Sequence, residues 1–493
     1  MIRSVGIDFG ISGPHKVQVL DEGAQLYDGF KFQSTPEGLA TLEERIFQDG
    51  ANPIIVFEPT SLTWLPVAIY IRARHPECRL VRAKGQKVAA LRKYLRGRSK
   101  SDRIDALTLA KMPFIDPEQL DNVYLPPAKF HTLQRLTRQR QRLEKEITAR
   151  KNRISALIDS YLPGLWRVFS DPWSPQARTF YRCKLNPFAV VQAGEEALHS
   201  FLAEAASRSK GCLVEAHQVY AACHNIATLY ELSAEAGVVD EGFFTDFQEE
   251  IARELRLMEA EETETETEAI AEHAEELYRK LHPQDYLRTI PGVGEHTAPV
   301  FLAAVGAPER FRNQSAFANW NGVVPGARQS SQVEGKGLRM TKAGPAIMKC
   351  GLYQAGDVGR RYDPQLAYVY HRQMVYHGKT HKQAMGAVMS HMGARVLTVL
   401  RENRPYELRD VQGNPISREE ARRLILEYKV LEEIRRERRQ RNPSRGNARK
   451  VAAKNQGMLE IYRTHEAAYA PQPGITPLIP QNLVYSISAK KAR

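Results

Sequence analysis

The apolar residues of this chain change their spacing near residue 130, and this change constrains the fold more than any other feature. Before it they come in strand-length runs: SVGIDFG (4–10), HKVQVLD (15–21), NPIIVFEPT (52–60) and CRLVRA (78–83). The turn-prone ISGP between the first two runs predicts an antiparallel hairpin. Because the helix-like LTWLPVAIYIRARH separates the last two, residues 1–125 are predicted to form an α/β sheet with helices packed on it.

A heptad pattern follows between about residues 130 and 165. Leu136, Leu143, Ile147, Ile154 and Ile158 are separated by steps of seven and four residues, the spacing of a coiled-coil seam. A second long helix is expected from about Glu250 to His282, where repeated Glu and Thr residues are typical of a solvated face. The seam is compatible with an antiparallel hairpin inside one chain and equally with association between protomers.

A chain of 493 residues is too long for one ordinary hydrophobic core, so several domains are expected. We expect an α/β domain over 1–125, a helical coiled-coil connector over 126–282, a helical domain over 283–403 and a basic tail over 404–493 that is helical first and flexible later. The arginine block EEIRRERRQRNPSRGNARK in this tail suits phosphate binding without sequence readout.

The charge of the chain points to a polyanionic partner. Its 70 Lys and Arg residues exceed its 57 Asp and Glu residues, which gives a formal charge of +13. Nucleic acid is the first candidate and an anionic membrane surface the competitor. A membrane is disfavoured because the longest apolar stretch, LTWLPVAIYI, is about half of what a spanning helix needs. Five scattered cysteines without a CxxC pair, and no signal-peptide pattern at the start, predict a cytoplasmic protein with reduced thiols.

Four acidic residues stand where their carboxylates can meet. Asp102 and Asp105 are three residues apart in KSDRIDALTLA, so on a helix they share one face with about 4.5 Å of rise between them. Asp8 lies in the strand-like VGIDFG, and Glu58 ends the apolar IIVFEP before a proline. Such strand-end carboxylates need solvent, a cationic partner or a metal, because burying one alone is costly. The four acids are therefore a candidate site for Mg²⁺, which takes a few carboxylates and keeps positions for phosphate oxygens.

Simpler explanations stand beside the metal site. Ser101 is a good N-cap and acids in the first turn of a helix are favoured by its dipole, while Asp8 can cap the hairpin turn and Glu58 can pair with an arginine. Basic residues just upstream of the paired aspartates suit a phosphate-binding surface, although some can be solvated helix faces. They are Arg82, Lys84, Lys87, Arg92, Lys93, Arg96, Arg98 and Lys100.

Residues 286–306, YLRTIPGVGEHTAPVFLAAVG, have the form of a helix, a tight turn and a second helix. Gly292 and Gly294 in the turn let backbone amides approach a phosphate, which predicts a helix-hairpin-helix element that grips the DNA backbone. The alternative is an ordinary helical hairpin whose glycines serve only packing.

The loop region that follows, residues 311–345, holds two adjacent serines, Ser330 and Ser331, and then Lys336, Arg339 and Lys342. A serine hydroxyl is a poor nucleophile at neutral pH and needs a base or a metal-polarised phosphate to attack. Cations nearby can stabilise the charge that grows on a pentavalent phosphate. Serines in polar loops more often serve turns, and no His or Lys is positioned by spacing alone to accept the proton.

The order of these motifs resembles the transposases of insertion-sequence family one hundred and ten. Asp8, Glu58 and then KSDRIDALTLA are similar to the DEDD tetrad of that family's RuvC-like domain, which implies an RNase H-like fold over 1–125. Residues 283–400, with Phe311 and a Gly-x-Arg-x-Thr-Lys-x-Gly run ending at Gly344, resemble the serine transposase domain that follows it.

The resemblance implies that one serine becomes covalently joined to DNA while the DEDD acids and magnesium position the scissile phosphate. It also implies a non-coding guide RNA and a homo-oligomer, a dimer or tetramer, in which the acids of one chain meet the serine of another. Counting forward from Pro325 favours Ser330 as the nucleophile and counting back from Thr341 favours Ser331, so both stay candidates. Gln332 departs from the family, which usually has a glycine directly after the serine.

These observations together predict a DNA transposase or site-specific recombinase of a mobile element. One alternative is a structure-selective nuclease of the junction-resolving kind, which uses activated water and no covalent serine. Another is a catalytically inactive protein that only binds nucleic acid.

Overall fold

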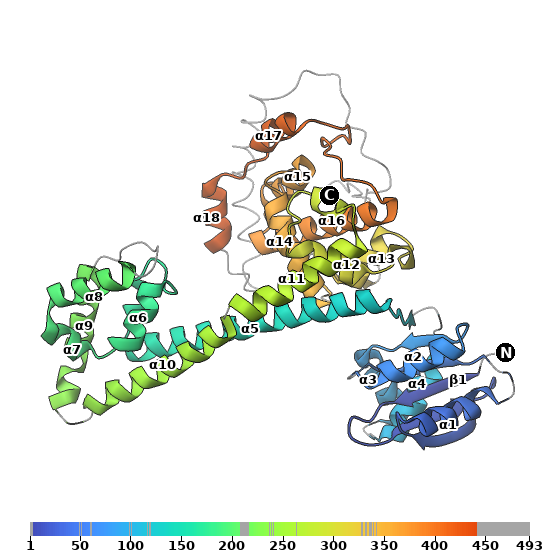
Figure 1. Ribbon diagram of the computed structural model, residues 1–493. Coiled ribbons are helices and arrows are strands. Elements are labelled where there is room, and N and C mark those ends of the chain that lie inside the picture. The colour runs from blue at the N-terminus through green and yellow to red at the C-terminus, as the bar shows by residue number, and fades with distance from the viewer. Residues whose placement is uncertain are drawn as a thin grey trace. The chain divides into compact units, whose positions relative to one another are not determined.

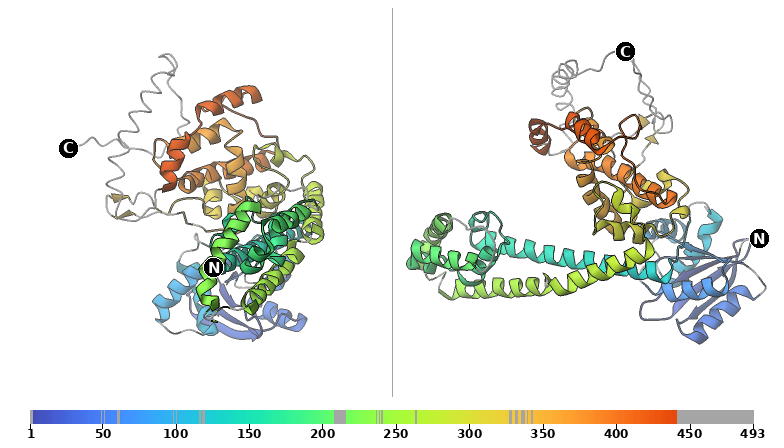
Figure 2. Two further views of the ribbon diagram at one scale, coloured as in Figure 1. Left: turned by 90° about the vertical axis from the view of Figure 1, so that its left-hand side faces the viewer. Right: turned by 45° about the horizontal axis from the view of Figure 1, so that its top comes forward.

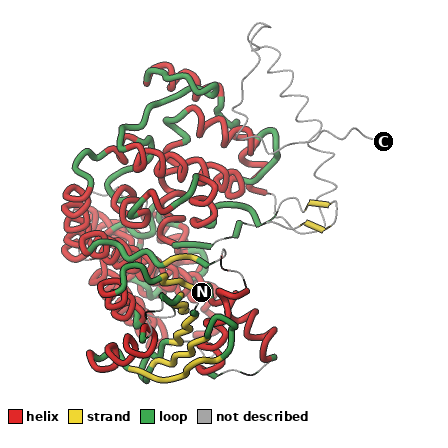
Figure 3. The backbone as a smooth tube through the Cα atoms, turned by 90° about the vertical axis from the view of Figure 1, so that its right-hand side faces the viewer, coloured by secondary structure: helices red, strands yellow, loops and turns green. Residues whose placement is uncertain are grey.

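Strands are concentrated at the start of the chain, and most of the rest is helical in the computed structural model (Figure 3). The chain divides into two compact units, Met1–Pro127 and Ala128–Arg493, which are described separately. The structure describes residues 3–440 apart from 49, 51, 60–61, 98, 100, 116, 118–119, 208–215, 236, 238, 240, 263, 327–328, 331–332, 335–337, 339 and 342.

The first unit is built on a six-stranded mixed sheet with the order β3-β2-β1-β4-β5-β6. Its strands are β1 (Ser4–Asp8), β2 (His15–Leu20), β3 (Leu26–Phe32), β4 (Ile54–Phe57), β5 (Arg79–Arg82) and β6 (Asp121–Asn122). The first three strands are antiparallel neighbours, β4 and β5 continue parallel to β1, and β6 is antiparallel to β5. The predicted hairpin and α/β sheet are confirmed, and the strand order is compatible with an RNase H-like domain.

Helices cover both faces of this sheet (Figure 1). Because side chains alternate along a strand, Val5 and Ile7 of β1 point to one face, where α1 (Pro36–Phe47) and α2 (Trp64–Arg74) bury them. The other face carries Val56 and Val81, which pack with α3 (Gly85–Arg96) and α4 (Asp102–Ile115). The helix carrying the paired aspartates therefore lies directly on the sheet.

Gly6 in the middle of β1 sets how closely α4 approaches. A Cβ at this position would lie 2.0 Å from the carbonyl oxygen of Ala106 and 2.4 Å from the amide nitrogen of Ala110. No side chain fits there, so the backbone of α4 rests on the backbone of β1. Ala106 and Ala110 are fully buried at this contact.

The second unit begins with a long helical hairpin. Helix α5 (Ala128–Tyr161) packs along α10 (Glu241–Glu262) and α11 (Glu264–Leu281), as Figures 1 and 2 show. Arg150 and Arg153 of α5 bind Glu254 of α10 at 3.2 and 2.9 Å. The long helices that the sequence predicts thus meet inside one chain. Helices α6 (Pro175–Cys183), α7 (Pro187–Ala193), α8 (Glu195–Ser207) and α9 (Ala216–Glu235) connect them at one end.

The predicted heptad seam is divided between two hydrophobic cores. Ile154 and Ile158 are fully buried in a core that α5 and α10 form with helices α6–α9. Leu136 packs instead against a separate core built mainly from the helices after residue 283. Helix α5 therefore joins two cores rather than forming one continuous seam.

The second core holds the helical region predicted for 283–403. Its helices are α12 (Thr297–Val305), α13 (Gln314–Asn321), α14 (Ala346–Gly359), α15 (Pro364–Met374) and α16 (His381–Glu402), with short helices η3 (Tyr286–Thr289) and η4 (Pro308–Arg310). Helices α17 (Arg418–Glu427) and α18 (Glu432–Gln440) follow, and Val430 and Ile434 belong to the same core. The start of the predicted tail thus packs on this domain, and its continuation after residue 440 lies outside the described residues. Within the part described, no helix has the length and hydrophobicity needed to cross a membrane.

Replacing Gly6 by alanine tests the contact between β1 and α4. We expect Gly6→Ala to lower the free energy of unfolding by about 3 kcal/mol, because the new methyl group overlaps rigid backbone atoms. Urea denaturation measures this change. Gly13→Ala is the matched control, since its Cβ meets no atom within 4 Å. Equal denaturation midpoints for the two variants would contradict the close contact.

Candidate active site

Asp8 is the central member of the four predicted acids. It ends β1, where the ladder places it opposite Lys16 of β2. Burial, and then the negative charges of Asp102, Asp105 and Glu58, raise its pKa to about 6, whereas Lys16 opposes this rise. The structure thus brings the four acids close enough to repel one another, although they come from three separate segments of the chain.

Asp102 and Asp105 occupy the first turn of α4 and each has a cationic partner. The Ser101 hydroxyl accepts a hydrogen bond from the Ile104 amide at 3.3 Å, so the predicted N-cap is present. Lys16 Nζ donates to the exposed carboxylate of Asp102. Arg92 Nη1 donates to Asp105 Oδ1 at 2.7 Å, and the Asp105 side chain is only 14% exposed. Both aspartates therefore serve the helix terminus and also face the site.

Glu58 follows β4 and lies over the start of α3. A Cβ on Gly85, the first residue of α3, would lie 2.4 Å from Glu58 Oε1, so the carboxylate approaches the backbone closely there. The N-terminus of a helix carries partial positive charge, which favours a carboxylate at this position. Glycine at position 85 is what makes room for it.

The donor chemistry of these residues fits a divalent cation. All four offer carboxylate oxygens, the ligands that Mg²⁺ prefers, and a cation would relieve the repulsion that raises the pKa of Asp8. Among the described residues, however, no three acidic, His or Cys side chains are arranged to hold a metal as they stand. Lys16 and Arg92 neutralise two of the four carboxylates in this arrangement.

The predicted phosphate-binding surface is described only in part. Arg92 faces Asp105 rather than solvent, and Lys93 is exposed on α3. Arg96 ends the same helix, but its side chain lies outside what the structure describes, as do Arg98 and Lys100. Arg92 therefore has a role that its place in a basic run did not reveal.

The serine loop is anchored at its base. Ser330 belongs to β7 (Gln329–Ser330), which pairs with β8 (Val333–Glu334), whereas Ser331, Lys336, Arg339 and Lys342 lie outside the described residues. Pro325 and Met340 pair across the base, and the Thr341 amide donates to the Val324 carbonyl at 3.0 Å. The two ends of the loop are thus held together.

Two glycines fix this base between α13 and α14. Gly344 has φ of +75°, and a Cβ on it would lie 1.9 Å from the Trp320 carbonyl oxygen. Gly322 has φ of +67° and approaches Ala343 in the same way. Lys349 of α14 donates to the carbonyls of Ala343 and Gly344, both at 2.8 Å. Gly344 ends the sequence run that resembles the serine transposase domain, and here it serves close backbone packing.

The turn at residues 290–294 has a clear packing role. Gly292 has φ of +91°, and its Cβ would lie 2.2 Å from the Ala355 carbonyl oxygen of α14. The Gly294 amide donates to Thr297 Oγ1 at 3.0 Å, at the start of α12. Gly292 thus fits the alternative in which the glycines serve packing, whereas a Cβ on Gly294 would meet no atom within 4 Å. Phosphate binding by the turn stays a prediction.

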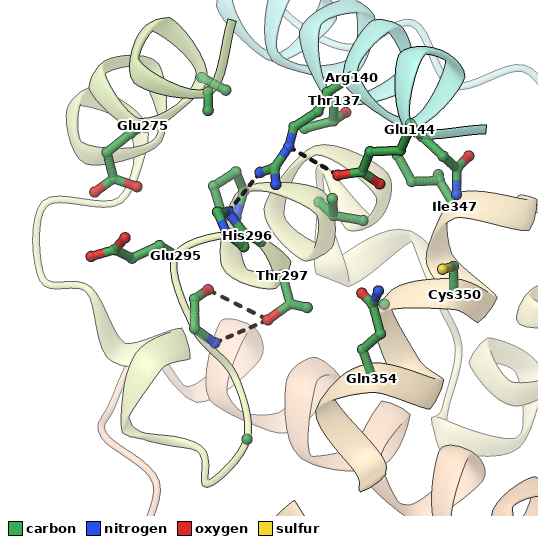
Figure 4. Close-up of a pocket in the computed structure, with 18 of the residues that line it drawn as sticks. Thr137, Arg140, Glu144, Glu275, Glu295, His296, Thr297, Ile347, Cys350 and Gln354 are labelled. Carbon is green, nitrogen blue, oxygen red and sulfur yellow. Dashed lines mark hydrogen bonds and ion pairs between the residues drawn. The ribbon is translucent and has the colours of Figure 1, made fainter. Parts of the chain in front are cut away.

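A cavity of about 470 Å³ lies beneath this turn, lined by α5, α11, α12 and α14 (Figure 4). Arg140 donates to His296 Nδ1 at 2.7 Å and contacts Glu144 at 3.2 Å. Burial, and then the charge of Arg140, lower the pKa of His296, which fits a neutral imidazole that accepts this bond. Four glutamates line the cavity, so it does not suit a phosphate. They are Glu144, Glu272, Glu275 and Glu295.

Lys16 is the site residue that the sequence reading missed. Lys16 belongs to no sequence motif, but the predicted hairpin contained enough information to place it near the acids. Pairing the two predicted strands across the ISGP turn places Lys16 beside Asp8. A register for the hairpin would therefore have suggested a cation within reach of the acids.

Two protein-family models match this chain. Residues 5–163 match a family model of DEDD transposases of IS110, described as "Transposase", and residues 284–371 match "Transposase IS116/IS110/IS902 family". A Streptomyces coelicolor protein named "Insertion element IS110 uncharacterized 43.6 kDa protein" is 24% identical over 411 residues, which is 83% of this chain and 96% of that protein.

Two pilin gene-inverting proteins are also similar over a shorter stretch. Those of Moraxella bovis and Moraxella lacunata are each 29% identical, over 130 and 125 residues, and this chain spans 40% and 38% of their lengths. The two family models match in order, the first across the four acids and on through α5, and the second over the region with the serine loop. The chain therefore belongs to the IS110 family of transposases, and it is an enzyme that cuts and rejoins DNA.

Proposed function

We propose that this transposase uses a divalent metal, Mg²⁺, bound by Asp8, Glu58, Asp102 and Asp105 in an RNase H-like domain. The observation that supports this most directly is the raised pKa of Asp8: burial raises it most, and the charges of the other three acids raise it further. Carboxylates that repel one another are placed for a cation, since like charges held together destabilise a fold. When bound, the ion would neutralise charge on a phosphoryl oxygen of DNA.

The protein's own residues prepare this site. Lys16 and Arg92 limit the repulsion between the acids while no metal is bound, and the N-terminus of α3 does the same for Glu58. The site works best with Asp8 ionised, so its proton has to leave before a cation binds. Its pKa of about 6 places this loss just below neutral pH.

Ser330 or Ser331 is proposed as the nucleophile. The serine Oγ forms a bond to phosphorus and loses its proton, while the bond between phosphorus and the leaving sugar oxygen breaks. The anchored base of the loop supports this role, because a reacting group needs a fixed support. The chain resembles enzymes in which the serine acts in an oligomer with a guide RNA, so both partners belong to the proposal, as does a cytoplasmic location.

Asp8→Asn tests the four-acid site through stability. Without divalent ions we expect the variant to be more stable than the parent by about 1 kcal/mol at about pH 8, because a repelled carboxylate is removed. The folded pKa of about 6 exceeds the ordinary value of 3.8, so the parent loses stability as pH rises through this window. Below about pH 4 both folded and unfolded Asp8 are protonated and the advantage disappears. Urea denaturation at both pH values measures this.

At about pH 8 in the presence of Mg²⁺, the parent should become more stable than Asp8→Asn. The ion stabilises the parent, which keeps all four carboxylates, more than it stabilises Asp8→Asn. Glu22→Gln is the matched control, because Glu22 is an exposed acid in the turn between β2 and β3 and should not change either response. A pH-independent difference, or an equal Mg²⁺ response in parent and Asp8→Asn, would refute the site.

The serine proposal predicts a protein–DNA adduct that survives denaturation. We expect one of Ser330→Ala and Ser331→Ala to abolish this adduct, because the attacking oxygen is lost. Gel electrophoresis of labelled DNA after incubation with Mg²⁺ measures it. Ser315→Ala, an exposed serine on α13, is the control and should keep the adduct.

Two further results would favour the nuclease or the inactive binding protein over the transposase. Cleavage that continues without any adduct in both serine variants would favour a nuclease that uses water. Intact DNA processing in Asp8→Ala and Asp102→Ala would remove the four acids from the chemistry.

A further inference from the structure

A second cavity, of about 720 Å³, lies in the helical domain. It is lined by residues of α14, α15, the start of α16 and α18. Four cationic side chains line it: Arg360, Lys382, Arg435 and Arg438. The acidic residue of its lining, Asp357, is already held by Arg360 at 2.6 Å and Arg361 at 2.8 Å. Arg435 and Arg438 have acidic neighbours on α18, Glu432 at 3.9 Å and Glu437 at 3.4 Å, but neither glutamate lines the cavity. The lining itself therefore holds more cations than acids.

Helix α18 supplies two of these cations from a fixed position. Ile434 is 2% exposed and belongs to the hydrophobic core, so it anchors the helix. The neighbouring Arg435 points its Nε into a buried position where, within the described chain, this donor has no hydrogen-bond partner. Arg438 is itself only 4% exposed. Because this Nε is closed to solvent, an anion in the cavity would have to be bound by the terminal guanidinium nitrogens of Arg435 and Arg438.

The start of α16 adds to the positive potential. Helix α16 is 22 residues long and its first turn contains His381 and Lys382 but no acid. A lysine at the positive end of a helix is electrostatically unfavourable, whereas an anion bound there is favoured. The placement of Lys382 is thus better explained by a ligand than by stability.

The walls of the cavity are held rigidly. The His381 ring is bonded through Nδ1 to the Tyr370 hydroxyl at 2.8 Å and through Nε2 to the Tyr353 hydroxyl at 3.0 Å. The guanidinium carbon of Arg360 lies 4.2 Å from the centre of the Tyr370 ring. Preorganised cations of this kind bind an anion with little loss of side-chain freedom.

We propose that this cavity binds a phosphodiester group of the nucleic-acid backbone. The ligand class rests on the proposed function, in which DNA and a guide RNA are the partners, and the site itself rests on the charge and geometry above. Helices α16 and α18 lie beyond residues 284–371, the part matched by the second family model. The cavity beneath the 290–294 turn is lined by four glutamates and is unsuited to the same ligand.

Arg435→Gln tests the proposal, and Arg436→Gln is a closely matched control. Arg436 is exposed on the same helix and does not line the cavity. We expect Arg435→Gln in the full-length protein to weaken nucleic-acid binding by roughly five- to tenfold, because a charge-assisted hydrogen bond to phosphate is lost. The slope of log affinity against log salt should fall by about 0.9 for duplex DNA or about 0.7 for a single strand. Fluorescence anisotropy with a labelled DNA duplex and a single-stranded RNA of equal length measures both.

Lys382→Gln is the second variant and should weaken binding in the same direction. Its removal does not harm the fold, because a cation in the first turn opposes the helix dipole. Loss confined to the DNA probe identifies DNA as the source of the phosphate, and loss confined to the RNA probe identifies RNA. Equal losses in Arg435→Gln and Arg436→Gln, or no loss in Arg435→Gln and Lys382→Gln, would overturn the proposal.

The result of the phosphate-binding test can be distinguished from the result of the metal-site test. Asp8→Asn changes the response to Mg²⁺ and should leave the salt slope intact, whereas Arg435→Gln should change the salt slope and leave the Mg²⁺ response intact. Normal binding by Arg435→Gln together with a lost Mg²⁺ response in Asp8→Asn would reject the phosphate pocket alone.

Discussion

The contact between the backbones of β1 and α4 at Gly6 is the constraint on which the candidate site depends. A helix lies this close to a strand only where a side chain is missing, and here the separation is small enough that even a methyl group would overlap Ala106 and Ala110. This contact sets the distance between the first turn of α4 and the end of β1. Because Asp102 and Asp105 occupy that turn and Asp8 ends the strand, an uncharged residue determines how strongly three charges interact.

The charges in turn show how the fold tolerates a site built from acids. Asp8 shifts towards its neutral form, while Lys16 and Arg92 offset the charge of Asp102 and Asp105. The helical domain has the opposite arrangement, with cations gathered around the cavity at α16 and α18 and one acid already in ion pairs. The acidic site would suit a cation and the basic cavity an anion, since clusters of like charge are common at functional sites.

Much of the first unit could be predicted from local pattern. The hairpin, the strand before Glu58 and the helix that starts at Asp102 follow from apolar runs, turn residues and capping, which act over a few residues. Strand β3 was not predicted, because its sequence LYDGFKF mixes exposed and buried residues at the edge of the sheet and shows no clear apolar pattern. Helix α1 was not predicted either. Lys16 and Arg92 as partners of the acids, and the division of the α5 seam between two cores, depend on contacts distant in sequence. The sequence pattern limits the candidate nucleophile to two adjacent serines in one loop. Which of the two attacks depends on where their side chains point.

Helix α5 is buried at one end by the core with Ile158 and at the other by the core with Leu133. An α-helix turns about 100° per residue, so inserting or deleting one residue between these ends would rotate one core away from its partner helices. A change of seven residues nearly restores the original direction, provided that α10 and α11 change with it. Relatives with a shorter or longer hairpin should therefore differ in this segment by steps close to whole heptads.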